Sequence, residues 1–377
     1  MAVNESQQGE RYGVCSRSER GASHSPRGGK YNSNWNMMNR QAVKWIGAAS
    51  GIWAVWVAIC LAGEGGLELS SSPTGEPTST NGWAVYTNNP VLRPGAPGTW
   101  DAGALGSMSV LKVGKLFHMY YEAWGIRGHS RMDYKTLQIG HATSRDGLHW
   151  TKAPANPVLP RGTSGAWDCD GTWDPFVLYE DGVFKMWYGG GMETHCDWGY
   201  AISTDGVRFV KQGQISHLGN VEDDHVVHDS TTGRYFMYYR DRKYAPPKGV
   251  FRASSTNETN FDFAHAEPIR IQGLPDSWMY KFTHVIGEQG KWYMFYGDED
   301  RSDCYTGLAT STDGLHWTLR NNRLILGDDG EVIRAKDDLW LMFYGPNGFF
   351  DEAGCDIRVA IYNGKLEDLA GKVPLNK

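Results

Sequence analysis

Five stretches of the chain repeat one pattern of apolar strands separated by polar turns. Each has an apolar strand, a tight turn, an aromatic strand, a longer loop and a third apolar strand. Short runs of this kind, bounded by glycine-rich turns, are typical of β-sheets. The aromatic strands share a methionine followed by two aromatic residues: Met119-Tyr120-Tyr121, Met186-Trp187-Tyr188, Met237-Tyr238-Tyr239, Met294-Phe295-Tyr296 and Met342-Phe343-Tyr344.

The spacing of these repeats, roughly 50 to 67 residues, lies within the range of propeller blades. The sequence therefore predicts an all-β fold, a five-bladed β-propeller. The fifth repeat lacks a clear fourth strand, but the segment from Gly82 to Leu92 matches Gly147 to Leu159, and both end in Asn-Pro-Val-Leu. We expect this N-terminal strand to join the last blade and close the ring, which hides open sheet edges.

The first 81 residues do not follow the repeat pattern. Residues 1–41 are a polar leader that we expect to be disordered, and residues 64–81 form a Gly/Ser/Pro/Thr linker. The apolar segment 42–63 between them is predicted to be a signal peptide, with an uncleaved membrane anchor as the alternative and a buried core helix less favoured. Both favoured interpretations place the propeller, residues 82–377, in a secreted, periplasmic or cell-surface location.

Composition narrows the classes of function. The net charge of -6 and the lack of a basic face argue against a nucleic-acid partner. The 16 tryptophans and 19 tyrosines suit strands, and they also suit stacking on sugar rings. Export is compatible with two disulfides, Cys169–Cys196 and Cys304–Cys355, with buried free thiols as the alternative.

Asp-Gly pairs follow the third strand in three repeats, at Asp146, Asp205 and Asp313. We interpret them as structural turns, because glycine allows positive φ and aspartate bonds to its own backbone. The aromatic residues that follow these turns are expected to pack between blades: Trp150, Phe209 and Trp317.

Acidic residues open most of the inner strands, and in a propeller these openings converge on one pocket over the central channel. Cleavage of a glycosidic bond needs a carboxylic acid that protonates the leaving oxygen and a second carboxylate that activates water or attacks the sugar. Crowding of carboxylates separates their pKa values and so distinguishes acid from base. For many of these residues, a solvated loop charge is the alternative. The openings carry Asp101 in blade one, Asp168, Asp170 and Asp174 in blade two, Glu222, Asp223 and Asp224 in blade three, Lys281 in blade four, and Asp328, Asp329 and Glu331 in blade five.

Aligning the second and third repeats on Met186 and Met237 makes Asp174 equivalent to Asp224, and the same rule gives Ser107 in blade one. Asp174 directly precedes Pro175 at the channel end of its strand, so we expect its side chain to point inward.

Asp-opening blades, with Asn-Pro-Val-Leu before Trp-Asp and Ser-x-Asp-Gly-x-His-Trp after the third strand, resemble the five-bladed propeller glycoside hydrolases of families 43, 32, 62, 117 and 130. The resemblance covers roughly residues 82 to 369. It implies that Asp174 is the blade-two carboxylate that tunes pKa values and grips the sugar, and that Glu222 or Asp224 is the acid. Blade one lacks an Asp-Pro pair, so Asp101 is the candidate base.

The expected substrate is a polysaccharide or oligosaccharide. Its candidate contacts are Trp173, Asp168, Asp170, His225, Arg240, Lys281 and Glu331. No cofactor is required. Some of the resembled enzymes hold a cation in the central channel, so His284 is the candidate ligand of a structural divalent cation, with a hydrogen-bonded packing histidine as the alternative.

The sequence thus predicts an exported glycoside hydrolase, and the resemblance favours inversion. The alternatives are a carbohydrate-binding propeller without catalysis and a glycoside phosphorylase, for which Lys281 and Arg240 leave a phosphate site open. Membrane contact is expected only through the N-terminal segment, and the sequence does not indicate an oligomeric state.

Overall fold

The computed structural model describes residues 82–125, 136–192, 195–244, 249–274, 279–288, 290–300, 303–346 and 356–372. The expected leader, signal or anchor segment and linker (residues 1–41, 42–63 and 64–81) lie outside the described residues. Within the described ranges, no helix is both long enough and apolar enough to cross a membrane.

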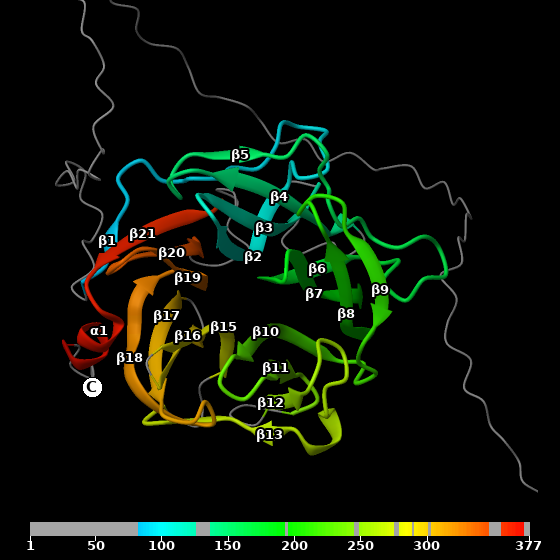
Figure 1. Cartoon of the computed structure of the whole chain (residues 1–377). Coiled ribbons are helices and arrows are strands. Elements are labelled where there is room, and N and C mark those ends of the chain that lie inside the picture. Colours follow the sequence, from blue (N-terminus) through cyan, green and yellow to red (C-terminus); the bar gives the residue numbers. More distant parts are fainter. Residues whose placement is uncertain are drawn as a thin grey trace, which may run out of the picture. The chain divides into compact units, whose positions relative to one another are not determined.

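Five sheets are arranged radially around a common axis, which confirms the predicted five-bladed propeller (Figure 1). Inside each blade, neighbouring strands run antiparallel, apart from one short parallel strand at the outer edge of blade four. From the channel outward, the first three blades are β2 (Ala104–Val113), β3 (Leu116–Trp124), β4 (Gln138–Ser144) and β5 (Trp150–Lys152); β6 (Thr172–Glu180), β7 (Val183–Met192), β8 (His195–Ser203) and β9 (Val210–Gln214); and β10 (Val221–Asp229), β11 (Arg234–Asp241), β12 (Val250–Ser255) and β13 (Glu267–Pro268).

The last two blades follow the same order. Blade four contains β15 (Met279–Glu288), β16 (Lys291–Asp300), β17 (Asp303–Ser311), β18 (His316–Leu326) and β14 (Arg270–Gln272), and blade five contains β19 (Asp328–Lys336), β20 (Leu339–Gly345), β21 (Arg358–Asn363) and β1 (Ala84–Val85). The described residues also include the 3₁₀ turn η2 (Phe263–His265) and the helix α1 (Leu366–Lys372).

The outer edge of blade five is built from both ends of the propeller sequence. Strand β1 pairs with β21 through Ala84 and Ile361. Beyond β1, the side-chain amide of Asn89 donates to Val359 O at 2.9 Å and its oxygen accepts from Val359 N at 2.8 Å. Asn156 makes the same two bonds with His141 in blade one. The two Asn-Pro-Val-Leu segments therefore hold equivalent edges.

The repeated methionines form the centres of the blades. All five are fully buried: Met119, Met186, Met237, Met294 and Met342. Each pairs across the inner hairpin with a valine, and these valines are Val110, Val177, Val226, Val285 and Val332. Because burial of these side chains stabilises every blade, each blade keeps apolar residues at the same positions, and the repeat is therefore visible in the sequence.

The Asp-Gly turns are structural, as predicted. Asp146 Oδ1 accepts hydrogen bonds from the backbone N–H groups of Leu148 and His149 and from the Ser144 hydroxyl. The aromatic residues after the turns pack between blades, which confirms the second part of that prediction. The ring pairs are Trp150 with Phe343, Phe209 with Tyr120, and Trp317 with Tyr238.

Two buried histidines in blade one predict a pH dependence of folding. His118 Nδ1 lies 3.1 Å from His141 Nε2, and the two rings stack. Burial, and then the neighbouring His118, lowers the pKa of His141 to about 3. Because an unfolded histidine binds a proton near pH 6.5, protons favour the unfolded chain below that pH. We expect the free energy of unfolding to fall as pH drops from about 6.5 toward 3.

Urea unfolding measured at several pH values checks this expectation. His141→Gln should flatten the pH dependence in that window, whereas His149→Gln, at an exposed position, should not. Equal slopes for wild type and His141→Gln would show that the buried pair does not control acid stability.

The expected Cys169–Cys196 disulfide does not form. Both residues are free thiols. Cys196 lies on β8 and is buried in an apolar cluster with Trp124, Leu137 and Trp173, whereas Cys169 is half-buried in the loop before β6. Burial raises the pKa of the Cys196 thiol to about 12, so this sulfur is an apolar core group rather than a nucleophile. The other expected pair includes Cys355, which lies outside the described residues.

Candidate active site

Every inner strand carries one extra residue near its entry, which forms a β-bulge. The register shifts lie between Leu105 and Met108, Trp173 and Phe176, Glu222 and His225, Phe282 and His284, and Asp328 and Glu331. Bulges bend a strand and re-aim its side chains, and they are common beside active sites. The five bulges together define one end of the channel, which we call the hub.

Three aspartates stand at these bulges in a left-handed backbone conformation: Asp174 with φ 41°, Asp223 with φ 56° and Asp329 with φ 53°. Aspartate tolerates positive φ better than most residues, but the conformation still costs on the order of 1–3 kcal/mol and is concentrated at functional sites. All three side chains are half-buried. The hub therefore presents carboxylates from blades two, three and five.

Hydrogen bonds join these bulges between blades. The N–H of Asp223 donates to Asp174 Oδ2 at 3.3 Å, and the Ser107 hydroxyl of blade one donates to Asp329 Oδ2 at 3.3 Å. Residues far apart in the sequence are thereby gathered at one place, as the propeller interpretation requires.

The predicted equivalence of Asp174 with Asp224 is wrong by one residue. Val177 pairs with Met186 in blade two, and Val226 pairs with Met237 in blade three. The connection between β10 and β11 is longer than that between β6 and β7, so alignment on the methionines does not give the equivalent residue. Counting back from the paired valines makes Asp223 the equivalent of Asp174, and both have positive φ.

Asp224 lies directly behind the hub carboxylates. Its side chain is buried, and among the described residues neither carboxylate oxygen has a hydrogen-bond partner. Burial, and then the negative charge of Asp174, raises the pKa of Asp224 well above its usual value. The raised pKa favours the protonated form of Asp224 beside the charge of Asp174, which is the arrangement that acid–base chemistry requires.

Glu222 stands at the start of the blade-three bulge and pairs with two arginines. Its carboxylate pairs with Arg240 at 2.9 Å and with Arg242 at 3.3 Å. Glu222 and Arg240 face each other across β10 and β11 at the entry of blade three. The structure therefore brings together Asp174, Glu222 and Asp224, three of the four predicted catalytic residues.

Asp101, the fourth, is held elsewhere. Its carboxylate pairs with Lys152 at 2.5 Å, and Asp168 pairs with Lys211 at 2.6 Å in the same way. Both aspartates are buried, and both lysines lie on the outermost strands. These ion pairs anchor equivalent loops above the outer parts of blades one and two. Asp101 therefore does not lie at the hub, and Asp168 holds its own loop in the same way.

Three further predicted substrate contacts, Trp173, Asp170 and Lys281, lie in different surroundings. Trp173 is buried in the cluster that contains Cys196, with Gly189 against its indole. Asp170 is half-buried before β6. The backbone of Lys281 lies in β15, opposite Gly297, and its side chain is outside the described part of the chain.

A ring of contacts, which we call the girdle, runs around the channel below the hub. It includes His225, His284 and Glu331. In each blade the residue before the paired valine reaches the next blade. Ser109 of blade one accepts a hydrogen bond from Val177 N, and Phe176 of blade two packs on the His225 ring. His225 of blade three donates to Val285 O, and His284 of blade four lies 2.7 Å from Glu331. Glu331 of blade five accepts a hydrogen bond from Val110 N and so returns to blade one. The girdle closes the five inner strands into a ring.

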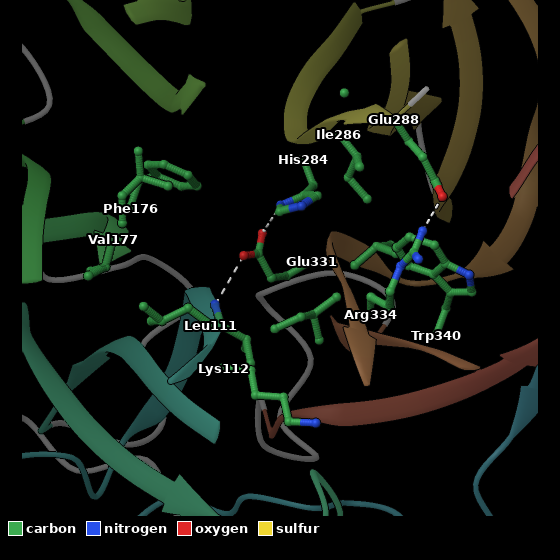
Figure 2. A pocket seen from close by; sticks show the side chains of 15 residues that line it. Leu111, Lys112, Phe176, Val177, His284, Ile286, Glu288, Glu331, Arg334 and Trp340 are labelled. Carbon is green, nitrogen blue, oxygen red and sulfur yellow. Dashed lines mark hydrogen bonds and ion pairs between the residues drawn. The ribbon is translucent and has the colours of Figure 1, made fainter. Parts of the chain in front are cut away.

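A pocket of about 410 Å³ lies between the inner strands of four blades (Figure 2). Its lining residues come after the bulges along these strands, so the pocket lies on the side away from the hub. Its inner end is formed by His284 and Glu331, and aliphatic residues such as Val177 and Ile286 line its walls. At the mouth, Arg334 pairs with Glu288 and lies over the Trp340 ring. The girdle therefore separates the acidic hub from a mainly apolar pocket.

Glu122 is a site residue that the sequence analysis missed. It lies on β3, is buried, and its Oε2 accepts the backbone N–H of Asp174 at 3.0 Å. One signal was available, because the third residue after the methionine is glutamate or arginine in two blades and glycine in three. These residues are Glu122, Gly189, Arg240, Gly297 and Gly345.

No protein-family model matches the chain. The chain is 26% identical over 242 residues to Uncharacterized protein Rv1502 of Mycobacterium tuberculosis, a match that covers 58% of this chain and 75% of that protein.

Solved structures share the fold. A β-1,2-mannobiose phosphorylase from Listeria innocua is 15% identical with a TM-score of 0.61 over 77% of this chain and 98% of that one. A glycosyl hydrolase from Bacteroides ovatus is 18% identical, with a TM-score of 0.57 over 75% of this chain and 94% of that one.

A third structure comes from work on family 130 of the mannoside phosphorylases. That family contains glycoside hydrolases that target β-1,2-mannosidic linkages in Candida mannan. This third structure is 17% identical, with a TM-score of 0.58 over 75% of this chain and 94% of that one. The chain thus has the five-bladed propeller fold found in glycoside hydrolases and phosphorylases.

Proposed function

We propose that this protein cleaves glycosidic bonds in an oligosaccharide or polysaccharide at the hub. The observation that carries the proposal is the buried Asp224 carboxyl near Asp174, whose pKa is raised by burial and then by the Asp174 charge. Acid–base cleavage of a glycoside needs one protonated and one ionised carboxyl group. Asp174 supplies the ionised group, and Asp224 holds the proton.

The access of these groups to a substrate differs. Asp174 is half-buried at the open end of the channel, whereas Asp224 is buried behind it. Asp174 therefore contacts the sugar, and Asp224 reaches the leaving oxygen through rotation of its short side chain when the substrate displaces water. Asp223 and Asp329, at the equivalent bulges, are placed to bind sugar hydroxyl groups.

A phosphorylase is the second candidate. Arg240 and Arg242 lie beside the hub carboxylates, and arginine binds phosphate oxygens in bidentate geometry. One of the solved structures that share the fold is a β-1,2-mannobiose phosphorylase. In such a reaction phosphate would replace water as the group that attacks the sugar.

A glycan panel assayed with and without inorganic phosphate tests the proposed function. Reducing sugar released without phosphate supports a hydrolase, and sugar phosphate formed only with phosphate supports a phosphorylase. Saturable binding of a glycan without turnover would identify a binding module and would overturn the proposed cleavage.

We also propose export, since residues 42–63 form an uncharged apolar run apart from Lys44. Fractionation of cells that express the full chain tests it. Recovery of the propeller outside the cytoplasmic membrane is expected, and recovery of the uncleaved chain in the cytosol would contradict it.

A structural cation is proposed at the girdle. His225, His284 and Glu331 offer ligand atoms within 4.8 Å of one another. His225 donates its Nε2–H to Val285 O, and its buried Nδ1 has no hydrogen-bond partner among the described residues. A ligand histidine usually donates its other N–H in this manner, so the residues fit a divalent cation. Such an ion would link blades three, four and five.

Elemental analysis of the purified protein checks the cation. We expect about one divalent ion per chain, lost in His284→Ala together with a lower melting temperature. Protein without metal, whose melting temperature does not respond to added Zn²⁺ or Ca²⁺, would contradict this prediction.

A further inference from the structure

The carboxylate of Glu122 is an unusual feature of the aromatic strand that carries it. Three other blades place glycine at the equivalent position, where the second strand passes the hub. Glu122 is only 2% exposed. Since a buried carboxylate is costly unless it is hydrogen-bonded, its presence requires a specific contact.

That contact is the backbone of Asp174. Glu122 Oε2 accepts the Asp174 N–H at 3.0 Å, across the boundary between blades one and two. The bond is made at the residue whose φ is 41°. This hydrogen bond to the backbone restrains the left-handed conformation without using the Asp174 carboxylate.

The backbone of blade one leaves space for the Glu122 carboxylate at Gly106. A Cβ atom on Gly106 would lie 2.1 Å from Glu122 Oε1, so only glycine fits beside the carboxylate. Gly106 stands at the bulge of β2. Residues 106 and 122 therefore form a matched pair, one supplying the carboxylate and the other the space for it.

We propose that Glu122 is a positioning residue that holds Asp174 in its productive conformation. The inference rests on the proposed function, in which Asp174 contacts the sugar. It assigns Glu122 no proton transfer, because its side chain is buried against Gly106 and the Asp174 backbone.

The test compares Glu122→Gln with Glu122→Ala. The glutamine keeps an oxygen that accepts the Asp174 N–H, so its kcat should stay within a few-fold of wild type. The alanine variant should lose about a hundredfold in kcat with little change in KM, because misplacement of a catalytic group affects the reacting state more than binding. Equal losses in both variants, or a loss confined to KM, would overturn the proposal.

Gly106→Ala provides a second, independent variant. The added methyl group displaces the Glu122 carboxylate, so it should reproduce the loss of kcat. In the double variant Gly106→Ala/Glu122→Ala the losses should not add, because both act through one bond. Additive losses would show that the two residues act separately.

Hydrogen exchange at Asp174 separates this proposal from the proposed function. The Asp174 amide should exchange faster in Glu122→Ala than in wild type, whether or not a substrate is known. Unchanged exchange would refute the positioning role. Faster exchange in a protein that cleaves no glycan would leave the role standing and refute the glycosidase.

Discussion

Asp174→Asn is expected to lower kcat/KM for glycoside cleavage by at least about a hundredfold, the range for loss of an acid–base group, and to leave the melting temperature unchanged. Asparagine is the matched substitution, because it tolerates positive φ and its side-chain oxygen still accepts the Asp223 N–H. The variant therefore removes the charge while keeping the shape of the bulge. Steady-state kinetics on the best glycan from the panel measure the loss.

The control for this variant is Asp181→Asn. Asp181 also has positive φ, at 52°, but it lies exposed in the turn between β6 and β7, at the end of the blade opposite the hub. It should keep full activity. Similar kinetics for wild type and Asp174→Asn would place the chemistry elsewhere and would remove the basis for the acid–base assignment.

Lys185→Met should lower the free energy of unfolding by about 3 kcal/mol, the largest effect on stability that we expect from a single polar residue. Lys185 Nζ lies 2.8 Å from Glu180 and 2.7 Å from Glu258, and it also donates to the Tyr235 hydroxyl. This network joins blade two to blade three. Methionine preserves most of the side-chain volume but leaves two partly buried carboxylates without their cation.

Urea denaturation measures this effect, with Arg208→Ala as the control. Arg208 pairs with Asp205 at 3.1 Å, but its side chain is 89% exposed, so its removal should cost less than about 1 kcal/mol. If Lys185→Met is no more destabilising than Arg208→Ala, the network between blades two and three does not support the fold.

The fold could be predicted because the residues that build it are local and repeated. Met119 and its four equivalents are fully buried, and each is followed by two aromatic residues. Burial at a fixed place in a repeated hairpin therefore leaves a pattern in the sequence. The Ser-x-Asp-Gly turns are visible for the same reason, since each is closed by bonds within a few residues.

The bulges were not predictable from the alternation of apolar and polar residues. A single extra residue reverses the side-chain alternation, so the sequence pattern does not show that β2, the inner strand of blade one, begins as early as Ala104. The connection between the first two strands is longer in blade three than in blade two, so only the register of the paired strands shows that Asp223, and not Asp224, is the equivalent of Asp174.

The chemical environment of each acidic residue depends on contacts between blades or between distant strands. Asp101 and Asp174 both follow a tryptophan, yet one pairs with Lys152 and the other bonds to Glu122 and Asp223. Their partners lie about 50 residues away in sequence. No local pattern records which acid is neutralised by a lysine and which faces the channel.

A crystal structure of Asp174→Asn with a bound oligosaccharide tests the central claim most directly. We predict that the scissile glycosidic oxygen lies over the hub, within about 3 Å of the side chain at position 174 or of Asp224. An oligosaccharide bound only in the pocket beyond His284 and Glu331, or only at the outer loops that Asp101 and Asp168 anchor, would contradict it.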